Sequence, residues 1–171
     1  MTKRPAFDPY AMFEALGHER VSYVVVGGFA RVVHGSAETT RGLDIVPSLR
    51  EENLRRLGRA LDELDARGPD RRPVDVASLA SSEPIEGRTR GGQVRIVPTP
   101  WGTRGYDDLR IRSVRENLGR GARPAIASVV DCVRMLEASD RNRDSERLDR
   151  LRRLMELERQ RLQQRRLTIE R

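Results

Sequence analysis

The order of apolar and polar positions along the chain predicts short strands and helices in mixed succession. The β-branched run from Val21 to Val26 is apolar on both faces, which is typical of a central strand. Leu43 to Val46 predicts a second short strand, which Pro47 closes. A helix capped by Ser48 follows, and its buried face comprises Leu54, Leu57, Leu61 and Leu64. This mixture predicts an α+β fold.

Weaker patterns surround these elements. Asp8 has the position of a cap for a first helix that Gly17 ends. Residues 69–91 are rich in Pro, Gly, Ser and Arg, which predicts a long surface loop with one helical turn near residues 74–80. Residues 94–97 predict a short strand. Residues 111–126 contain two further short runs that predict a hairpin lying across the sheet.

The C-terminal part of the chain is predicted to be helical and highly charged. A helix begins after Ser128, and a longer one covers residues 143–166. The apolar stripe of this longer helix fades after Leu157, so we expect its last two turns to project into solvent or to meet a partner. The chain is thus divided into a main domain, residues 1–142, and a charged helical extension, residues 143–171.

Composition narrows the class of protein. Apolar residues make up 37% of the 171 residues, enough for a modest core in one domain. The chain has no apolar run of about eighteen residues, and its N-terminus lacks the apolar segment of a secretory signal. We therefore expect a cytoplasmic protein that does not contact a membrane. Cys132 is the single cysteine, which excludes a disulfide framework and predicts a buried thiol.

The charge balance favours a polyanionic partner. Thirty-three basic residues face twenty-six acidic ones, for a formal net charge of +7. Such a surface is typical of proteins that bind RNA, DNA or nucleotide phosphates. Lys3 is the sole lysine, however, and the codon composition of a GC-rich genome would produce the same arginine bias. Within the final helix, only residues 160–166 carry enough unbalanced positive charge to suggest phosphate contact.

The chemistry of the first two strands is concentrated in one short region. Gly27 and Gly28 follow the first strand, and backbone N–H groups at such a turn can approach phosphate oxygens closely. Asp44 lies on the second strand and is expected to point toward this turn. Thr40 and Arg41 lie just before that strand. The pattern predicts a phosphate pocket that faces a carboxylate.

These residues carry a resemblance. The Gly-Gly pair, the Thr40-x-x-Leu-Asp-Ile run and the thirteen residues between Gly28 and Gly42 resemble the signature of the nucleotidyltransferase superfamily, in particular the small bacterial AbiEii-type toxin transferases. The resemblance implies a small mixed β-sheet flanked by helices, here with a long C-terminal helix. It also implies Mg²⁺-dependent transfer of a nucleotide from a nucleoside triphosphate to a tRNA end or a protein hydroxyl.

Three positions depart from the pattern of this family. The signature normally ends Asp-hydrophobic-Asp, whereas this chain has Gly42-Leu43-Asp44, so the first carboxylate is absent. Aligning the segment Gly102 to Leu109 with its family counterpart places Arg95 where the third carboxylate belongs. In the later family helix, Leu136 replaces a basic residue that lies near the nucleotide phosphates. The catalytic set implied by the resemblance is thus reduced to Asp44.

The remaining motif positions are retained or conservatively replaced. By resemblance, the residues expected to bind nucleotide or phosphate are Gly27, Gly28, Arg31, Thr40, Arg41, Arg141 and Arg143. Tyr106, Asp107 and Asp108 follow a Gly-rich turn and are candidates for contact with a base, a ribose or a partner, or alternatively for a structural cap. We expect His34 to make a structural hydrogen bond rather than act as a base, and Trp101 to cover the edge of the core rather than stack on a ligand.

Two accounts of the site follow. Nucleotidyl transfer needs two divalent ions held by several carboxylates, and a single carboxylate would hold one ion weakly. In the first account, Arg95 forms a salt bridge with Asp44 in place of a metal ion, and the site is catalytically degenerate. In the second account, a replacement ligand keeps an atypical transferase active, and the candidates are Glu38, Asp75, Asp107 and Asp108.

The favoured function is therefore that of a pseudoenzyme with a nucleotidyltransferase fold, which binds nucleic acid, nucleotide or a cognate protein partner and requires no cofactor. The first alternative is an active toxin-type transferase that uses Mg²⁺ and a nucleoside triphosphate. The second is an antitoxin-like or scaffold protein that acts through its terminal helix alone.

Overall fold

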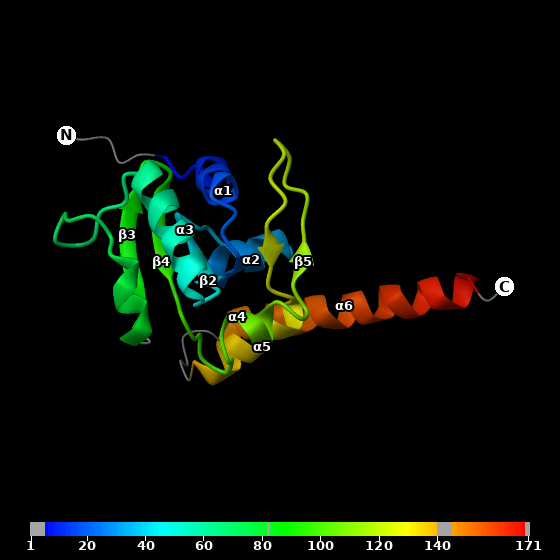
Figure 1. The fold of residues 1–171 in the computed structure, drawn as a ribbon. Coiled ribbons are helices and arrows are strands. Elements are labelled where there is room, and N and C mark those ends of the chain that lie inside the picture. The colour runs from blue at the N-terminus through cyan, green and yellow to red at the C-terminus, as the bar shows by residue number, and fades with distance from the viewer. Residues whose placement is uncertain (1–5, 82, 140–144, 170–171) are drawn as a thin grey trace.

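A computed structural model describes residues 6–81, 83–139 and 145–169 of the chain. Its sheet has six strands in the order β3-β4-β2-β1-β6-β5, and helices pack on both faces (Figure 1). The elements are α1 (Pro9–His18), β1 (Tyr23–Val26), α2 (Gly27–Val33), β2 (Gly42–Pro47), α3 (Glu51–Glu63), η1 (Val76–Ser81), β3 (Ile85–Thr89), β4 (Gly92–Ile96), α4 (Tyr106–Leu109), β5 (Val114–Arg115), β6 (Ala125–Ile126), α5 (Val129–Ala138) and α6 (Ser145–Ile169). The predicted α+β class is confirmed.

The register of the strands brings three charged positions together. β1 runs antiparallel to β2, β2 runs parallel to β4, and β4 runs antiparallel to β3. Asp44 on β2 is paired with Arg95 on β4, and Arg95 is paired with Glu86 on β3. Because directly paired residues of neighbouring strands point to the same face, these three side chains share one face of the sheet.

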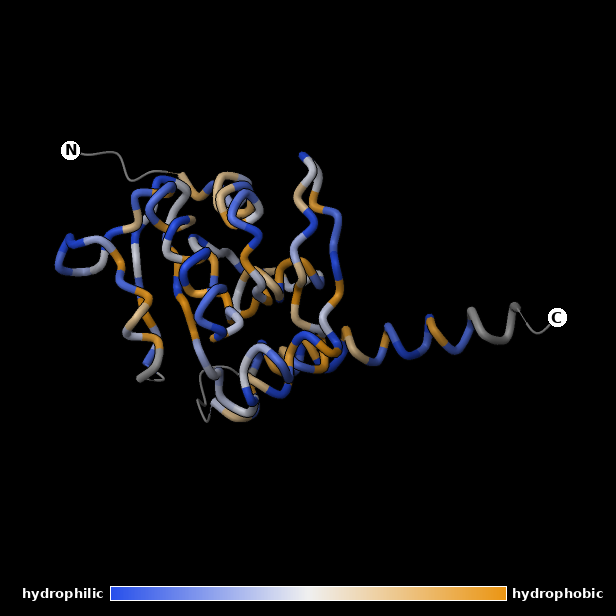
Figure 2. The backbone as a smooth tube through the Cα atoms, in the orientation of Figure 1, coloured by the Kyte–Doolittle hydropathy of each residue, from blue (hydrophilic) through white to orange (hydrophobic). Residues whose placement is uncertain are grey.

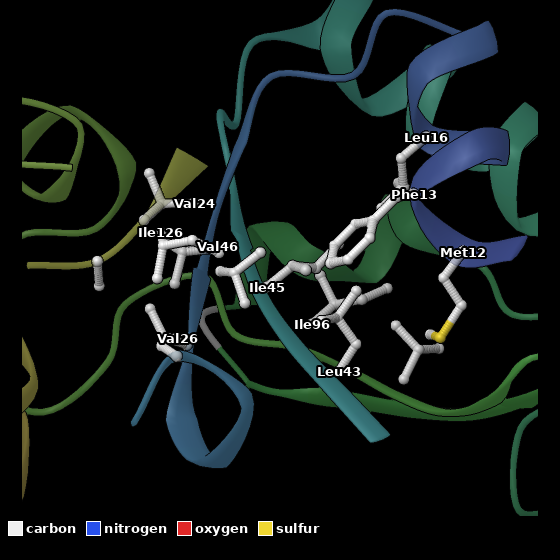
Figure 3. Packing of buried hydrophobic residues seen from close by; sticks show 14 of the residues in the cluster. Met12, Phe13, Leu16, Val24, Val26, Leu43, Ile45, Val46, Ile96 and Ile126 are labelled. Atoms are coloured by element: carbon white, nitrogen blue, oxygen red, sulfur yellow. The ribbon is translucent and has the colours of Figure 1, made fainter. Parts of the chain in front are cut away.

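The opposite face of β2 and β4 packs against α1 and forms one part of the core. Alternation along β2 and β4 turns Leu43, Ile45 and Ile96 away from the charged face, and all three are fully buried. In Figure 3, Met12, Phe13 and Leu16 of α1 point toward these strand residues. The burial of large apolar side chains on this face fixes which residues of β2 and β4 face the solvent.

Local signals at the helix ends were predicted with mixed success. Asp8 caps α1 as expected, since its carboxylate accepts hydrogen bonds from the backbone N–H groups of Tyr10 and Ala11. The predicted cap of α3 was wrong. The residue at the cap position is Arg50, without a side-chain hydrogen bond, whereas the buried Ser48 lies before the helix.

The predicted loop and hairpin also require correction. Residues 69–91 contain the expected helical turn, η1, but also the edge strand β3, which the sequence pattern did not predict. The predicted hairpin is reduced to the two-residue strands β5 and β6, joined by an arm of residues 116–124 (Figure 1). Tyr10 of α1 holds this arm, because its hydroxyl donates a 2.7 Å hydrogen bond to the carbonyl of Leu118.

The final helix follows the predicted pattern. Leu151 is fully buried, whereas Leu157 and Leu162 are exposed. The outer part of α6 extends away from the rest of the molecule, and its surface is mostly polar (Figures 1 and 2). The predicted division at residue 142 falls in the segment outside the described residues and stays a prediction. None of the described helices combines the length and hydropathy needed to cross a membrane.

Asn53 of α3 is a structural junction that can be tested. Its buried side chain accepts a 2.7 Å hydrogen bond from the Ser22 backbone N–H and donates to the carbonyls of Ser22 and Ser48, at 3.0 and 2.8 Å. Asn53→Ala removes the partner of the Ser22 N–H and of the Ser48 carbonyl, whereas the Ser22 carbonyl keeps its hydrogen bond from the Ser48 N–H. We therefore expect the free energy of unfolding to fall by about 1–3 kcal/mol in urea denaturation. The exposed neighbour provides a control, since Glu52→Ala should change stability by less than about 0.5 kcal/mol. Equal effects of the two changes would refute this role of Asn53.

Candidate functional site

The site begins where β1 ends. Gly27 has a φ of +67°, a left-handed conformation that side chains disfavour. A Cβ atom at Gly27 would lie 2.5 Å from Oδ2 of Asp44. The Gly-Gly turn therefore lets the Asp44 carboxylate lie directly on the backbone, at the point where strand register places Asp44 opposite Val26. The predicted approach of Asp44 to the turn is confirmed.

The second glycine borders an internal ion pair. A Cβ at Gly28 would lie 3.3 Å from a carboxylate oxygen of Glu38 and 3.6 Å from the hydroxyl of Thr40. The Arg31 guanidinium donates two hydrogen bonds to Glu38, at 2.8 and 2.9 Å, and the Ser36 hydroxyl donates a third. Both partners of this pair are largely buried, so Glu38 is held firmly beside the turn.

The charged face of the sheet forms one wall of a large cleft, here called the Asp44 cleft. Its first lobe, the arginine lobe, has a volume of about 880 Å³. Seven arginines and three carboxylates line it: Arg31, Arg41, Arg67, Arg71, Arg88, Arg95 and Arg147, with Glu38, Asp44 and Glu86. The excess of arginine makes this lobe suited to an anionic ligand that carries several negative charges.

The second lobe of the cleft, the Trp101 lobe, is less polar. It has a volume of about 530 Å³ and shares Gly28, Arg31, Asp44, Arg95 and Arg147 with the arginine lobe. Trp101, Met135 and Leu136 also line it. The expectation that Trp101 covers the core edge was wrong, because its side chain is 74% exposed. An indole ring at the mouth of a cleft offers a flat surface on which an aromatic ligand can stack.

Arg95 does not bind Asp44 as predicted. In the described part of the chain, the carboxylate within ion-pair distance of Arg95 is Glu86, with Nε 3.6 Å from Oε1. Both side chains of this pair are well exposed, so it contributes little to stability and an incoming anion can replace it. The charge of Arg95 nevertheless acts on Asp44 from the neighbouring strand.

Two carboxyl groups in the cleft have opposite pKa shifts. Burial raises the pKa of Asp44, and the charges of Arg95 and Arg31 offset this effect only in part. Burial also acts to raise the pKa of Glu38, but hydrogen bonds from Arg31 and Ser36 outweigh it and lower that pKa. Within the described residues no side chain pairs directly with Asp44, and its charge is the less favourable of the two.

The donor set does not fit a two-ion metal site. Among the described residues, no three His, Cys, Asp or Glu side chains come together as a group that could hold a metal ion. Glu38 is bound firmly by Arg31, whereas Glu86 forms a weak, exposed pair with Arg95. An aspartate at position 42 would not fit unaided, because a Cβ at Gly42 would lie 2.7 Å from the carbonyl oxygen of Gln93. The close pairing of β2 with β4 thus requires Gly42.

Several predicted residues lie elsewhere. Tyr106 lines a separate cleft near the start of β1. Asp107 pairs with Arg110 on the surface, and Asp108 accepts a 2.9 Å hydrogen bond from Arg134 of α5 and another from the Arg104 backbone N–H. These contacts correspond to the structural alternative for the Asp107-Asp108 pair. Asp75 is also structural, since it accepts a hydrogen bond from the Ala77 backbone N–H in η1.

The structure tests two further predictions, for His34 and Cys132, but not those for Arg141 and Arg143. His34 makes the expected structural hydrogen bond, with Nε2 2.7 Å from the carbonyl of Ala127. Cys132 is buried as expected, and burial raises the pKa of its thiol to about 12. The predicted phosphate ligands Arg141 and Arg143 lie outside the described residues.

Five charged residues of the arginine lobe were not predicted from the sequence: Arg67, Arg71, Glu86, Arg88 and Arg147. Two of them, Glu86 and Arg88, belong to β3, and Arg67 exchanges backbone hydrogen bonds with Arg88. The available signal was the alternation of Ile85, Gly87 and Thr89 with the charged residues between them, which predicts a strand with one polar face. Recognition of this strand would have revealed the lobe.

Comparison with known proteins establishes the fold. No family model matches the chain, and no curated protein sequence matches it. Its structure is similar to that of the antibiotic-resistance factor ANT(2'')-Ia, with a TM-score of 0.55 and 13% identity over 95% of this chain and 92% of that one. It is also similar to a Thermotoga maritima protein provisionally assigned as a nucleotidyltransferase, with a TM-score of 0.51 and 18% identity over 85% of this chain and 88% of that one. The chain therefore has a nucleotidyltransferase-like fold.

The contact between Gly27 and Asp44 can be tested by adding one carbon atom. Gly27→Ala places a Cβ against Oδ2 of Asp44 in a left-handed backbone, so we expect a loss of about 2–4 kcal/mol in the free energy of unfolding. Gly17→Ala serves as the control, since within the described structure a Cβ there meets no atom within 4 Å. Adding Asp44→Ala to Gly27→Ala should recover part of the loss. Strict additivity of the two changes would contradict the proposed contact.

The opposite pKa shifts predict opposite pH dependences of stability. The raised pKa of Asp44 means that the ionised form is disfavoured in the folded state, so Asp44→Asn should increase stability at pH 7. This gain should disappear as pH falls through the folded pKa of Asp44 toward its ordinary value, roughly pH 4. Urea denaturation at several pH values measures the difference from the unmodified chain.

Glu38 provides the control of opposite sign. Its lowered pKa contributes stability above the ordinary pKa of a glutamate, and this contribution is lost as pH falls through the folded value. Glu38→Gln should therefore reduce stability at pH 7 by about 1–3 kcal/mol. The loss should diminish in acid. The same sign for both variants at pH 7 would show that the two carboxyl groups have been assigned wrongly.

Proposed function

We propose that this chain is a nucleotidyltransferase-fold protein that binds a phosphodiester polyanion, single-stranded nucleic acid, in the Asp44 cleft and does not transfer nucleotides. The observation that carries the proposal is the distribution of charge in the cleft. The Arg31 guanidinium holds Glu38, Arg95 forms a weak exposed pair with Glu86, and the charges of Arg31 and Arg95 both act on Asp44. These guanidinium groups would supply the positive charge that divalent cations supply in a catalytic site.

The arginine lobe supports binding of several phosphates. Its seven arginines exceed its carboxylates by four, and Arg41, Arg71 and Arg88 are exposed. Guanidinium groups bind phosphate oxygens through paired hydrogen bonds, and each neutralised phosphate releases counterions. A chain of phosphates lying along β3 and β4 would neutralise this excess charge.

The Trp101 lobe supports a nucleic acid over an unrelated polyanion. The exposed indole of Trp101 lies in the lobe that shares Gly28, Asp44 and Arg95 with the arginine lobe. A ligand with phosphates in one lobe can therefore place a base in the other. Base stacking on an aromatic side chain is worth roughly 1–3 kcal/mol and depends little on base identity. We accordingly infer binding with little sequence preference.

The resemblance to AbiEii-type toxin transferases keeps an active enzyme as the competing proposal. Such an enzyme would use Mg²⁺ and a nucleoside triphosphate, and Asp44 would need additional carboxylate ligands. A scaffold that acts through α6 alone is a third proposal, for which the exposed Leu157 and Leu162 are the available surface. The three proposals differ in whether nucleotide is consumed and in which arginines affect binding.

The test measures binding of a fluorescent single-stranded RNA by anisotropy at several salt concentrations. Arg41→Gln with Arg88→Gln removes two exposed charges from the arginine lobe. We expect weaker binding and a slope of log affinity against log salt that falls by roughly 1.4, at about 0.7 per phosphate contact. Trp101→Ala should weaken binding with little change in the slope, because stacking releases no counterions.

The control for this test removes the same charge from the projecting helix. Arg159 and Arg161 lie outside both lobes, so the double change Arg159→Gln, Arg161→Gln should alter the affinity for RNA only slightly. Incubation of the unmodified chain with labelled nucleoside triphosphates, RNA and Mg²⁺ or Mn²⁺ should yield no labelled product. Incorporation of label that Asp44→Asn abolishes would establish the active transferase instead.

A further inference from the structure

A second basic cleft lies at the opposite end of β1 from the Gly-Gly turn. It has a volume of about 690 Å³ and is bounded by the end of α1, by α4 and by the arm between β5 and β6. Arg20, Arg110, Arg115 and Arg123 line it, together with Tyr23 and Tyr106. We name it the Tyr106 cleft. It shares no lining residue with either lobe of the Asp44 cleft.

The charged residues that line the Tyr106 cleft, among those the structure describes, are all arginines. Among the described residues, no aspartate or glutamate lines it, although four arginines do. Arg110 binds Asp107 at 2.9 Å in an exposed pair of little strength. Arg115 donates a 3.2 Å hydrogen bond to the carbonyl of Arg123, which engages one of its five N–H donors. The cleft is thus more uniformly positive than the arginine lobe, which three carboxylates also line.

Hydrogen bonds of the arm and of the turn after α1 fix the walls of the cleft. Tyr10 holds the arm through the hydrogen bond from its hydroxyl to Leu118, and the Arg120 guanidinium lies 4.7 Å from the centre of the Tyr10 ring. On the facing wall, the turn after α1 is closed by hydrogen bonds from the N–H groups of Arg20 and Val21 to α1 carbonyls. The backbone that carries these arginines is therefore held in place before a ligand binds, which reduces the conformational entropy lost on binding.

Two aromatic side chains add a different kind of surface. Tyr23 and Tyr106 are half-buried, and both reach the lining of the cleft. Burial raises the pKa of the Tyr23 phenol, so its hydroxyl remains a neutral hydrogen-bond donor. Arginines interleaved with aromatic rings are the combination by which proteins bind single-stranded nucleic acid, through phosphate contacts and base stacking.

We propose that the Tyr106 cleft is a second nucleic-acid site, which takes a segment of single-stranded RNA or DNA with its phosphates on the arginines and a base against Tyr106. The four arginines come from the turn after α1, the end of α4, β5 and the arm, and they exceed what one phosphate requires, so the ligand is a polymer rather than a mononucleotide. This site operates without the Asp44 cleft, and the proposal stands even if that cleft binds no nucleic acid.

The experiment locates bound RNA directly. Single-stranded RNA containing 4-thiouridine is cross-linked to the full chain, and the modified peptides are identified by mass spectrometry. The proposal predicts cross-links on peptides that contain Tyr23 or Tyr106, and these should persist in the Arg41→Gln, Arg88→Gln variant of the Asp44 cleft. Loss of those same cross-links in that variant, or cross-links confined to peptides of the Asp44 cleft, would overturn it.

Matched variants test the charges and the ring separately. Arg20→Gln with Arg123→Gln removes two exposed cleft charges, and we expect RNA affinity to fall roughly tenfold and the salt slope to fall by about 1.4. The pair Arg159→Gln, Arg161→Gln removes equal charge from α6, and an equal loss there would assign the effect to net charge and refute the site. Near-ultraviolet circular dichroism verifies that each variant is folded.

Two further measurements define the ligand. Tyr106→Leu should weaken RNA binding, whereas Tyr106→Phe, which retains the ring, should restore it. Equal affinities for the two variants would exclude stacking on Tyr106.

Competition with uridine monophosphate and with inorganic phosphate distinguishes the source of the phosphate group. Either competitor displacing RNA from the Tyr106 peptides at micromolar concentration would overturn the assignment to a polymer.

Discussion

The structure of the site depends on the close approach of a carboxylate to a backbone. Asp44 lies against Gly27, whose left-handed conformation and missing Cβ allow a contact that any larger residue would block. This contact places an acid at the end of the sheet, where burial raises its pKa. The charged face of β2, β4 and β3 is then built outward from this point by strand register.

Arginine determines what this arrangement can bind. A cluster of acids would attract cations, but here guanidinium groups pair with two of the three carboxylates and act on the third. The result is a cleft lined by more arginines than carboxylates, on a nucleotidyltransferase-like fold. Fold and chemistry are thus separable, because strand order fixes which positions meet, whereas the residue types at those positions fix the sign of the charge.

The sequence predicted correctly those features that depend on residues close together in the chain. The apolar run of β1, the Asp8 cap and the fading stripe of α6 could be predicted because each depends on neighbouring residues. The partner of Arg95 could not, since it depends on β3, an edge strand whose Gly87 and charged residues obscure its alternation. Trp101 was also misassigned, because its neighbours Pro100 and Gly102 do not reveal that the side chain is exposed.

The central claim is that arginines, rather than divalent ions, occupy the charged face around Asp44. Electron paramagnetic resonance of Mn²⁺ titrated into the unmodified chain, with and without a nucleoside triphosphate, tests it most directly. The account predicts that the chain itself sequesters no Mn²⁺ at micromolar concentration and that Asp44→Asn leaves the titration unchanged. Two Mn²⁺ ions bound per chain with spin coupling between them, lost in Asp44→Asn, would contradict it.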